Sequence, residues 1–327
     1  ESRRGRGPVV LAGSAGSGKT PIAVHRLAEA AGTGVRALYL AYSPWLKEHA
    51  SRLYGDLLAA RGLEAAGTAP RFLTFDELYR DLAPVELRGV RMVSAELFES
   101  WFRKSGSRLD PALVWEEIRS ILKGACRDLG RPMLDREAYL ELGRKRAPLF
   151  ADDRPEIFRV GRRYQEWLSG EGRTDQIDLC RGAFRALPSA RPGALAVVCD
   201  EVQDLTELEL EFVLALAGSG GLGRLLLAGD TQQIVNPSGF RWAEVRGLLR
   251  QPGREAAPVL RLRRNFRSVA PLVGLANALL GLRRELFGRG DEDEPEEAVA
   301  EAVHVAAPGL SLSCRAESAS GICDSSL

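Results

Sequence analysis

The stretch Gly13 to Thr20, with the sequence GSAGSGKT, most constrains what this chain can fold into. It fits the spaced pattern G-x-x-x-x-G-K-[ST], between an apolar run at Pro8 to Leu11 and a helical apolar pattern at Ile22 to Ala31. Glycines in such a turn let backbone N–H groups converge on phosphate oxygens, and the positive end of the following helix adds to that field. The stretch therefore predicts a phosphate-binding loop between a strand and a helix. The alternative is a Gly/Ser-rich connection with an incidental lysine.

In the first interpretation the whole stretch holds a nucleotide, with Lys19 reaching the outer phosphates and the Thr20 hydroxyl ligating Mg²⁺. The predicted nucleotide-binding residues are Gly13, Ser14, Ala15, Gly16, Ser17, Gly18, Lys19 and Thr20.

Length and charge set the frame for this site. With 327 residues, 45% of them apolar, the chain is predicted to form about two globular domains or subdomains. Residues 288–327 hold 2 basic and 9 acidic side chains, which leaves 43 basic and 35 acidic ones in residues 1–287. This excess of positive charge suits a polyanionic partner.

No apolar run reaches the roughly 18 to 20 residues of a membrane helix, so we expect no membrane partner and a cytoplasmic location. The five cysteines show no spacing typical of zinc or disulfides.

The strand and helix patterns alternate over residues 8–80, as in a parallel α/β sheet. Residues 84–190 instead show long amphipathic patterns and are predicted to be a mainly helical insertion. Strand patterns resume at Leu195 to Cys199, Arg224 to Ala228 and Val259 to Leu262. The predicted fold class is α/β, a parallel sheet split in the sequence by a helical insertion. The predicted domains are a nucleotide-binding lobe from 1–83 and 191–257, the insertion 84–190, the start of a second lobe at 258–287, and an acidic, disordered tail at 288–327.

Polar residues follow the later strands, at the edge where parallel strands present their ligands. Asp200 and Glu201 come directly after the apolar run LAVVC, where Asp200 can hold Mg²⁺ and Glu201 can orient or deprotonate a water. Helix capping is the alternative role for carboxylates there, above all for Asp204. Gln233, in GDTQQ, could sense the γ-phosphate. The arginines of Leu262 to Ser268, LRRNFRS, are predicted to lie between a strand and a helix, where one guanidinium group can stabilise charge on a transferring phosphoryl group. A solvated basic loop is the alternative.

The ordered set GSAGSGKT, DEVQD, GDTQQ and RNFRS resembles superfamily 1 DNA helicases of the UvrD/Rep type. The resemblance implies a RecA-like P-loop NTPase lobe, ATP and Mg²⁺ as cofactors, and an insertion comparable to their 1B subdomain. It further implies that Gln203 links the ATP state to DNA binding, that Gln233 contacts the γ-phosphate, and that Arg267 is an intrachain arginine finger. The segment DQIDL, Asp175 to Leu179, is similar to the acidic-leucine segment that leads back to the family's core.

The resemblance also implies single-stranded DNA as a partner, with Tyr42, Phe240 and Arg241 as base-stacking and phosphate-contacting residues. Core packing is the alternative for Tyr42, and it is our expectation for Trp45 and Phe75. RNA is not excluded as the track.

The sequence departs from the pattern of the UvrD/Rep-type helicases at several positions. Asp76 stands where the family often has histidine, and Phe240 follows Gln233 at a longer spacing than usual. The adenine-recognising segment and the later motifs of the second RecA-like lobe are missing, so we expect this chain to be an incomplete N-terminal portion. The proposed activity is an ATP-dependent helicase or translocase. A P-loop ATPase switch and a nucleotide-binding regulatory module without unwinding activity are the alternatives.

Overall fold

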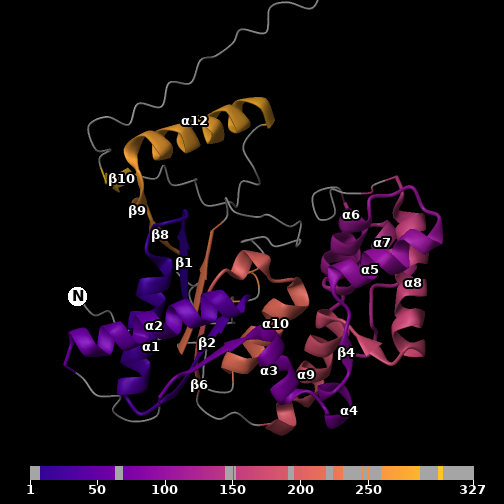
Figure 1. The fold of residues 1–327 in the computed structure, drawn as a ribbon, viewed down its shortest axis with the longest axis horizontal. Helices are drawn as coiled ribbons and strands as arrows, with labels where there is room; N and C mark the ends of the chain where they lie inside the picture. The colour runs from indigo at the N-terminus through magenta and orange to yellow at the C-terminus, as the bar shows by residue number, and fades with distance from the viewer. Residues whose placement is uncertain are drawn as a thin grey trace, which may run out of the picture.

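A computed structural model describes residues 8–62, 69–143, 150, 152–190, 195–218, 224–230, 245, 247, 249, 259–287 and 301–304. The predicted site residues Gln233, Phe240 and Arg241 lie outside these described residues, so their roles stay predictions. Figure 1 shows the sheet beneath helix α12 and beside the helices of the insertion.

A six-stranded sheet forms the centre of the molecule, and every pairing in it is parallel. In spatial order its strands are β3 (Arg71–Thr74), β2 (Arg36–Ala41), β6 (Leu195–Cys199), β7 (Leu225–Gly229), β1 (Val9–Gly13) and β8 (Val259–Leu262). Every residue of β6 and β7 is buried, which explains why these strands read as unbroken apolar runs rather than as alternating patterns. The predicted mixed α/β class with a parallel sheet is confirmed.

Helices cover both faces of the sheet. The helices α1 (Lys19–Gly32) and α2 (Pro44–Ala60) pack on one face, and α3 (Phe75–Leu82), α9 (Gln176–Ala190) and α10 (Glu207–Gly218) pack on the other. Because successive strand residues point to opposite faces, Val197 and Cys199 lie in one core while Ala196 and Val198 lie in the other. The α9 side chains share a core with the sheet, although we assigned residues 176–190 to the insertion.

The insertion has a core of its own, made of residues from Val93 to Leu168 and rich in aromatic side chains. Its elements are α4 (Val85–Arg88), β4 (Arg91–Met92), α5 (Ala95–Phe102), a 3₁₀ turn (Arg103–Ser105), α6 (Pro111–Glu116), a π-helical segment η2 (Glu117–Lys123), α7 (Arg136–Leu140), α8 (Arg154–Gly170) and β5 (Arg173–Thr174). It is mainly helical as predicted, with one two-stranded pairing of β4 with β5 that the sequence did not indicate.

The DQIDL segment holds this insertion to the sheet lobe through a buried lysine. Lys123 in η2 is 1% exposed, and its Nζ lies 2.5 Å from Asp175 Oδ2 and 2.8 Å from Asp178 Oδ2. Gln165 in α8 also accepts a hydrogen bond from Lys123 Nζ, at 2.8 Å. Both acidic residues of the segment therefore neutralise a charge that burial would otherwise make very costly.

The chain leaves the sheet at β8 and builds a second, smaller unit. Strand β9 (Arg264–Val269), helix α12 (Ala270–Phe287) and strand β10 (Glu301–His304) follow, with β10 parallel to β9. RNFRS lies between strand β8 and helix α12, as predicted, and the segment is itself a strand, β9, rather than a loop. Strand β8, which we assigned to the second lobe, pairs with β1 in the first sheet.

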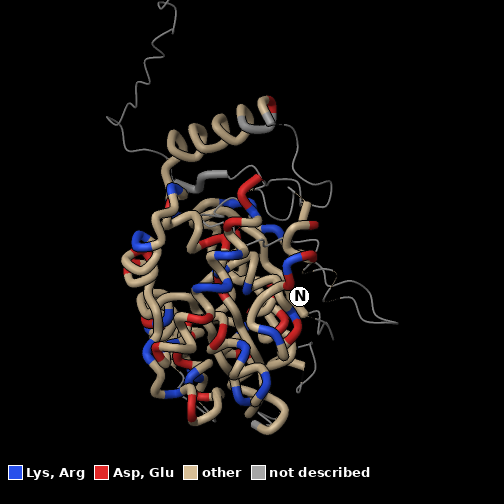
Figure 2. The backbone as a smooth tube through the Cα atoms, turned by 90° about the vertical axis from the view of Figure 1, so that its right-hand side faces the viewer, with Lys and Arg blue, Asp and Glu red and all other residues tan. Residues whose placement is uncertain are grey.

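Helix α12 stands apart from the sheet and is almost free of charged residues along most of its length (Figures 1 and 2). One of its faces carries exposed leucines at helical spacing, namely Leu272, Leu275, Leu279, Leu282 and Leu286. No helix among the described residues is both long and apolar enough to cross a membrane.

Candidate functional site

The Gly13–Thr20 stretch forms the turn between β1 and α1, as predicted. Gly16 and Gly18 have φ of 74° and 88°, in the left-handed region where glycine alone is unstrained. Gly18 is the N-cap of α1 and provides no side-chain cap, so the first N–H groups of the helix stay available to an anion. The hydroxyls of Ser14 and Ser17 are buried without a hydrogen-bond partner among the described residues. This donor set fits a phosphate group.

Lys19 lies within this loop. Its side chain is 7% exposed, and Nζ donates to the carbonyl oxygens of Gly13 at 2.8 Å and Ser14 at 3.2 Å. Asp230 Oδ2, at the end of β7, lies 3.9 Å from the same Nζ. The ammonium group is thus held at the mouth of the loop, where a carboxylate from another strand faces it.

Thr20 and Asp200, the predicted Mg²⁺ ligands, are in direct contact although they are far apart in the sequence. Thr20 Oγ1 donates to Asp200 Oδ2 at 2.7 Å, and the hydroxyl of Tyr39 donates to the same oxygen at 2.8 Å. Burial, and then the neighbouring Asp200 carboxylate, raise the pKa of Tyr39, so its proton stays on the hydroxyl. Asp200 is 1% exposed, and its carboxylate is oriented by both hydroxyls.

Glu201 has an unusual backbone. Its φ of 55° lies in the left-handed region, which is uncommon for a residue with a side chain and clusters at functional sites. The pKa of its carboxyl group is raised, chiefly by burial. The hydrogen bond from Gln203 Nε2 at 2.7 Å lowers this pKa, and the charge of Asp200 raises it. Gln203 Oε1 in turn accepts from the Asp230 backbone N–H at 2.9 Å. Gln203 therefore bridges the ends of β6 and β7.

Strand β9 lies against the turn Gly13–Thr20. Asn265 Nδ2 donates to the Ala15 carbonyl oxygen at 2.9 Å, and the Phe266 N–H donates to Gly16 O at 2.8 Å. A Cβ on Gly16 would lie 2.6 Å from Arg267 Cβ, so the two backbones meet here without room for a side chain. The structure thus brings Arg267 beside the loop, where its side chain is exposed. Its role as a finger stays a prediction.

The aromatic residues predicted near the ends of β2 and β3 have different environments. Phe75 is 1% exposed and belongs to the core, as expected. The expectation of core packing for Trp45 is wrong, because its side chain is 64% exposed and stacks on His49 with ring centroids 5.4 Å apart. Trp45 is the second residue of α2, so its side chain lies at a helix end rather than on the helix face that packs on the sheet. Tyr42 is half-buried, and Arg119 lies over its ring.

Asp76, at the position where the family often has histidine, pairs instead with Arg80, one turn later in α3, at 3.1 Å.

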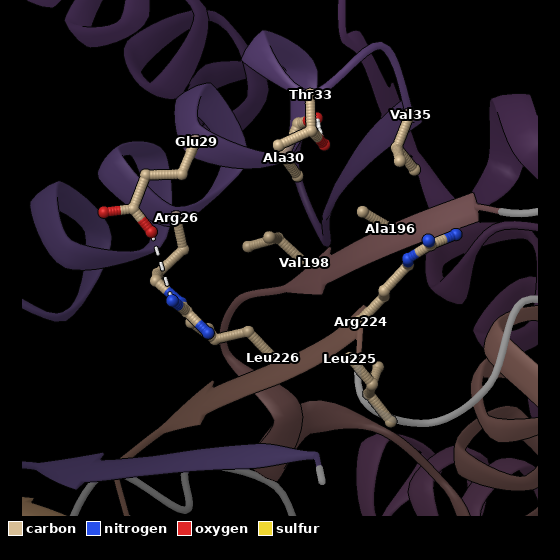
Figure 3. A pocket seen from close by; sticks show the side chains of 10 residues that line it. All are labelled: Arg26, Glu29, Ala30, Thr33, Val35, Ala196, Val198, Arg224, Leu225 and Leu226. Carbon is tan, nitrogen blue, oxygen red and sulfur yellow. Dashed lines mark hydrogen bonds and ion pairs between the residues drawn. The ribbon is translucent and has the colours of Figure 1, made fainter. Parts of the chain in front are cut away.

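A cavity of about 230 Å³ lies over the central strands β6 and β7, beside α1 (Figure 3). Arg26 and Arg224 stand on either side of an apolar floor that includes Val198 and Leu226. None of the predicted nucleotide residues lines it.

Among the described residues no group of three or more histidine, cysteine or acidic side chains could hold a metal ion. A metal at Thr20 and Asp200 would complete its shell with phosphate oxygens and water, as Mg²⁺ commonly does.

Sequence reasoning missed Tyr39, Asn265 and the contact of Asp230 with Lys19. Tyr39 reads as one more apolar residue in the strand run ALYLA, and no local signal shows that its hydroxyl meets Asp200. Asn265 is visible in RNFRS, where a short polar side chain among arginines could have indicated a backbone contact.

Comparisons with known proteins give distant relatives. No family model matches the chain. The human protein "TPR and ankyrin repeat-containing protein 1" is 31% identical over 225 residues, covering 63% of this chain and 8% of that protein. "DNA helicase II" of Escherichia coli is 28% identical over 153 residues, covering 42% of this chain and 20% of the relative.

"ATP-dependent DNA helicase UvrD2" of Mycobacterium tuberculosis is 27% identical over 301 residues, covering 85% of this chain and 42% of the relative. The chain therefore spans less than half the length of each of these three relatives. Its all-parallel sheet is consistent with a RecA-like fold. By sequence, it is distantly similar to DNA helicases.

Proposed function

We propose that this chain is the ATP-binding part of an ATP-dependent DNA helicase or translocase with a P-loop NTPase fold, in which hydrolysis is coupled to binding of single-stranded DNA. The observation that carries the proposal is the contact of Thr20 with Asp200 at 2.7 Å beside the phosphate-binding turn. Two segments 180 residues apart meet there with the two side chains that magnesium-dependent phosphoryl transfer requires. The similarity to DNA helicases supports the same activity.

Each residue of the site has a task in this proposal. The backbone N–H groups of Gly13 to Thr20 bind phosphate oxygens, and Lys19 neutralises the charge of the outer phosphates. Thr20 and Asp200 would hold Mg²⁺, which supplies a positive charge that stabilises the developing charge on the transferred phosphoryl group. Tyr39 keeps the Asp200 carboxylate oriented through its own hydrogen bond.

Glu201 is the proposed general base for the attacking water. Its raised pKa brings the carboxylate closer to the range in which a base works at neutral pH. Gln203, held between Glu201 and Asp230, positions that carboxylate. Arg267 and Gln233 would contact the phosphates as the helicase resemblance implies.

Single-stranded DNA is the proposed track, with RNA not excluded, and Tyr42, Phe240 and Arg241 are the proposed contacts. A second RecA-like lobe in the complete protein would close on the bound ATP, and β9 with α12 would be its first elements.

Two substitutions test the site. Lys19→Ala should weaken binding of a fluorescent ATP analogue in the presence of Mg²⁺ by about ten-fold or more, because a charge-assisted contact is worth about 1.5–3 kcal/mol. Lys104→Ala, which removes an exposed lysine of the insertion, is the control and should bind as the wild type does. Glu201→Gln should retain the affinity but lose turnover. Normal affinity in Lys19→Ala would refute the site.

A nucleotide-binding regulatory module is the second candidate, and one observation favours it. The 31% identical human relative is named for its repeats and not as a helicase. An oligo(dT) strand distinguishes the two functions, because a helicase lobe in its complete protein should hydrolyse ATP faster when the strand is added. A regulatory module would bind ATP with negligible turnover either way.

A further inference from the structure

Arg119 is a buried arginine of the insertion that none of the roles above uses. It lies in η2, a π-helical segment, and is 7% exposed. Segments of π-helix are rare and occur frequently at functional sites. Here it accompanies a charged side chain that points out of the insertion and into the sheet lobe.

On the lobe side Arg119 contacts Tyr42. Its Nη2 donates a hydrogen bond to the Tyr42 hydroxyl, and its guanidinium carbon lies 5.5 Å from the centre of the ring. The Tyr42 hydroxyl donates to Gln176 Oε1 at 3.3 Å, and the ring lies beside Phe75 with centroids 6.4 Å apart. The guanidinium therefore covers one face of the Tyr42 ring, and a nucleic-acid base that stacks on that face must displace it.

The same guanidinium faces the loop that follows Glu201. Nη2 of Arg119 lies 4.0 Å from Glu209 Oε2, and that carboxylate oxygen accepts hydrogen bonds from both the N–H and the hydroxyl of Thr206 at 3.0 Å. Glu209 is fully buried. Arg119 thus reaches the end of the loop Asp200–Thr206 through one side chain.

Backbone packing makes this junction stiff. The Leu208 N–H donates to the Gly124 carbonyl oxygen at 2.9 Å, directly after η2. A Cβ on Gly124 would lie 2.7 Å from Thr206 Cβ, so insertion and loop touch without a gap. A shift of η2 must therefore be passed to Thr206.

Negative charge around Arg119 exceeds its own positive charge. Glu116 lies 3.7 Å from Nη1, Glu209 lies 4.0 Å from Nη2, and the charge of Arg119 also acts on Asp204 in the loop. A buried guanidinium cannot be left without partners, because the uncompensated charge would cost several kcal/mol. When it leaves Tyr42 it has carboxylates of the loop and of α10 to move toward.

We propose that Arg119 is a positioning residue that couples occupation of the nucleic-acid surface at Tyr42 to the nucleotide loop Asp200–Thr206. A base that stacks on Tyr42 displaces the guanidinium toward Glu209 and Asp204, and the loop that carries Glu201 shifts with it. The inference rests on the proposed function, since it names how that same site is regulated. By reciprocity, bound nucleotide must change the affinity for the nucleic acid by the same factor.

The test measures this coupling in the full chain. The affinity for a fluorescent ATP analogue with Mg²⁺ is titrated with and without saturating oligo(dT), and oligonucleotide affinity is followed by anisotropy with and without the nucleotide. The ratio of affinities is the coupling factor, expected at about five-fold or more in the wild type. Arg119→Met should bring it to about one and leave nucleotide affinity without oligonucleotide within about two-fold of wild type.

Arg127→Met is the matched control. Arg127 also ties the insertion to α10, through Glu207 at 3.2 Å and Glu211 at 3.1 Å. It should retain the wild-type coupling factor. Tyr42→Phe keeps the ring and removes the hydroxyl, so it should lower the coupling factor as Arg119→Met does, and the double variant should show no further loss.

Arg119→Lys keeps the charge without the planar fork and serves if circular dichroism shows that Arg119→Met does not fold. It should retain only part of the coupling. Wild-type coupling in the folded Arg119 variants, or equal loss in Arg127→Met, would overturn the inference and leave the proposed function standing. A wild-type chain that binds both ligands without coupling would overturn the inference and would also count against the proposed coupling of hydrolysis to single-stranded DNA. Failure to bind the nucleotide would overturn the proposed function as well, and failure to bind only oligo(dT) would remove the surface on which the inference depends.

Discussion

The contact between Gly16 and strand β9 gives a prediction whose size follows from the structure. Gly16→Ala places a methyl group at a φ of 74°, which costs about 1–2 kcal/mol for an L-residue. That methyl would also lie 2.6 Å from Arg267 Cβ and 2.8 Å from Asn265 Oδ1, so β9 must move away from the turn. The two hydrogen bonds that join β9 to Ala15 and Gly16 are then lost, at about 1 kcal/mol each. The expected total is about 3–4 kcal/mol.

Gly34→Ala is the matched control for this experiment. Gly34 has a φ of 76°, but nothing lies within 4 Å of the added Cβ. The variant therefore loses only the free energy of placing an L-residue in the left-handed region. Urea unfolding followed by circular dichroism should therefore separate the two variants by about 2 kcal/mol in the free energy of unfolding. Equal losses in the free energy of unfolding would show that the contacts of β9 with the turn do not stabilise the fold, and the reasoning about Gly16 would be refuted.

Three further predictions concern buried groups. Lys123→Met leaves Asp175 and Asp178 without their cation and should lower the free energy of unfolding by about 3–5 kcal/mol, measured in urea at pH 7; a loss below about 1 kcal/mol would contradict the buried pair. Burial, and then Glu201, raise the pKa of Asp204 to about 6, so the protonated form is favoured in the folded state and stability falls as the pH rises from about 4 through 6. Asp204→Asn should remove that fall in a pH series of melting temperatures, and an unchanged profile would exclude Asp204 as its source. Gly124→Ala, whose methyl would lie 2.6 Å from Ser120 O, should cost about 1–3 kcal/mol, whereas Gly170→Ala, with open space around it, should be close to neutral in the same urea assay.

Local sequence patterns were sufficient for the strands and for the turn at Gly13 to Thr20. Runs such as LAVVC are apolar at every position because β6 is covered on both faces. Five consecutive residues are enough to show this pattern. The carboxylates of Asp200 and Glu201 could be placed at the same sheet edge as Lys19 because parallel strands all end there.

Contacts between distant side chains could not be predicted in this way. The hydrogen bond from Tyr39 to Asp200 and the contact of Arg119 with Tyr42 join residues that no shared periodicity links. Trp45 misled us because an aromatic residue beside a helical pattern indicates a core, whereas its place at the start of α2 exposes it. The strand character of RNFRS could not be predicted, because its pairing partner β10 lies far along the chain.

A single residue, Arg263, separates β8 in the first sheet from β9 in the second unit. A movement of α12 about Arg263 would also move β9, and with it the hydrogen bond from the Phe266 N–H to Gly16 O. The connection is too short to absorb the movement as slack, since one residue spans less than 4 Å. A partner that binds to the exposed leucine face of α12 and moves the helix would therefore also displace the turn at Gly16.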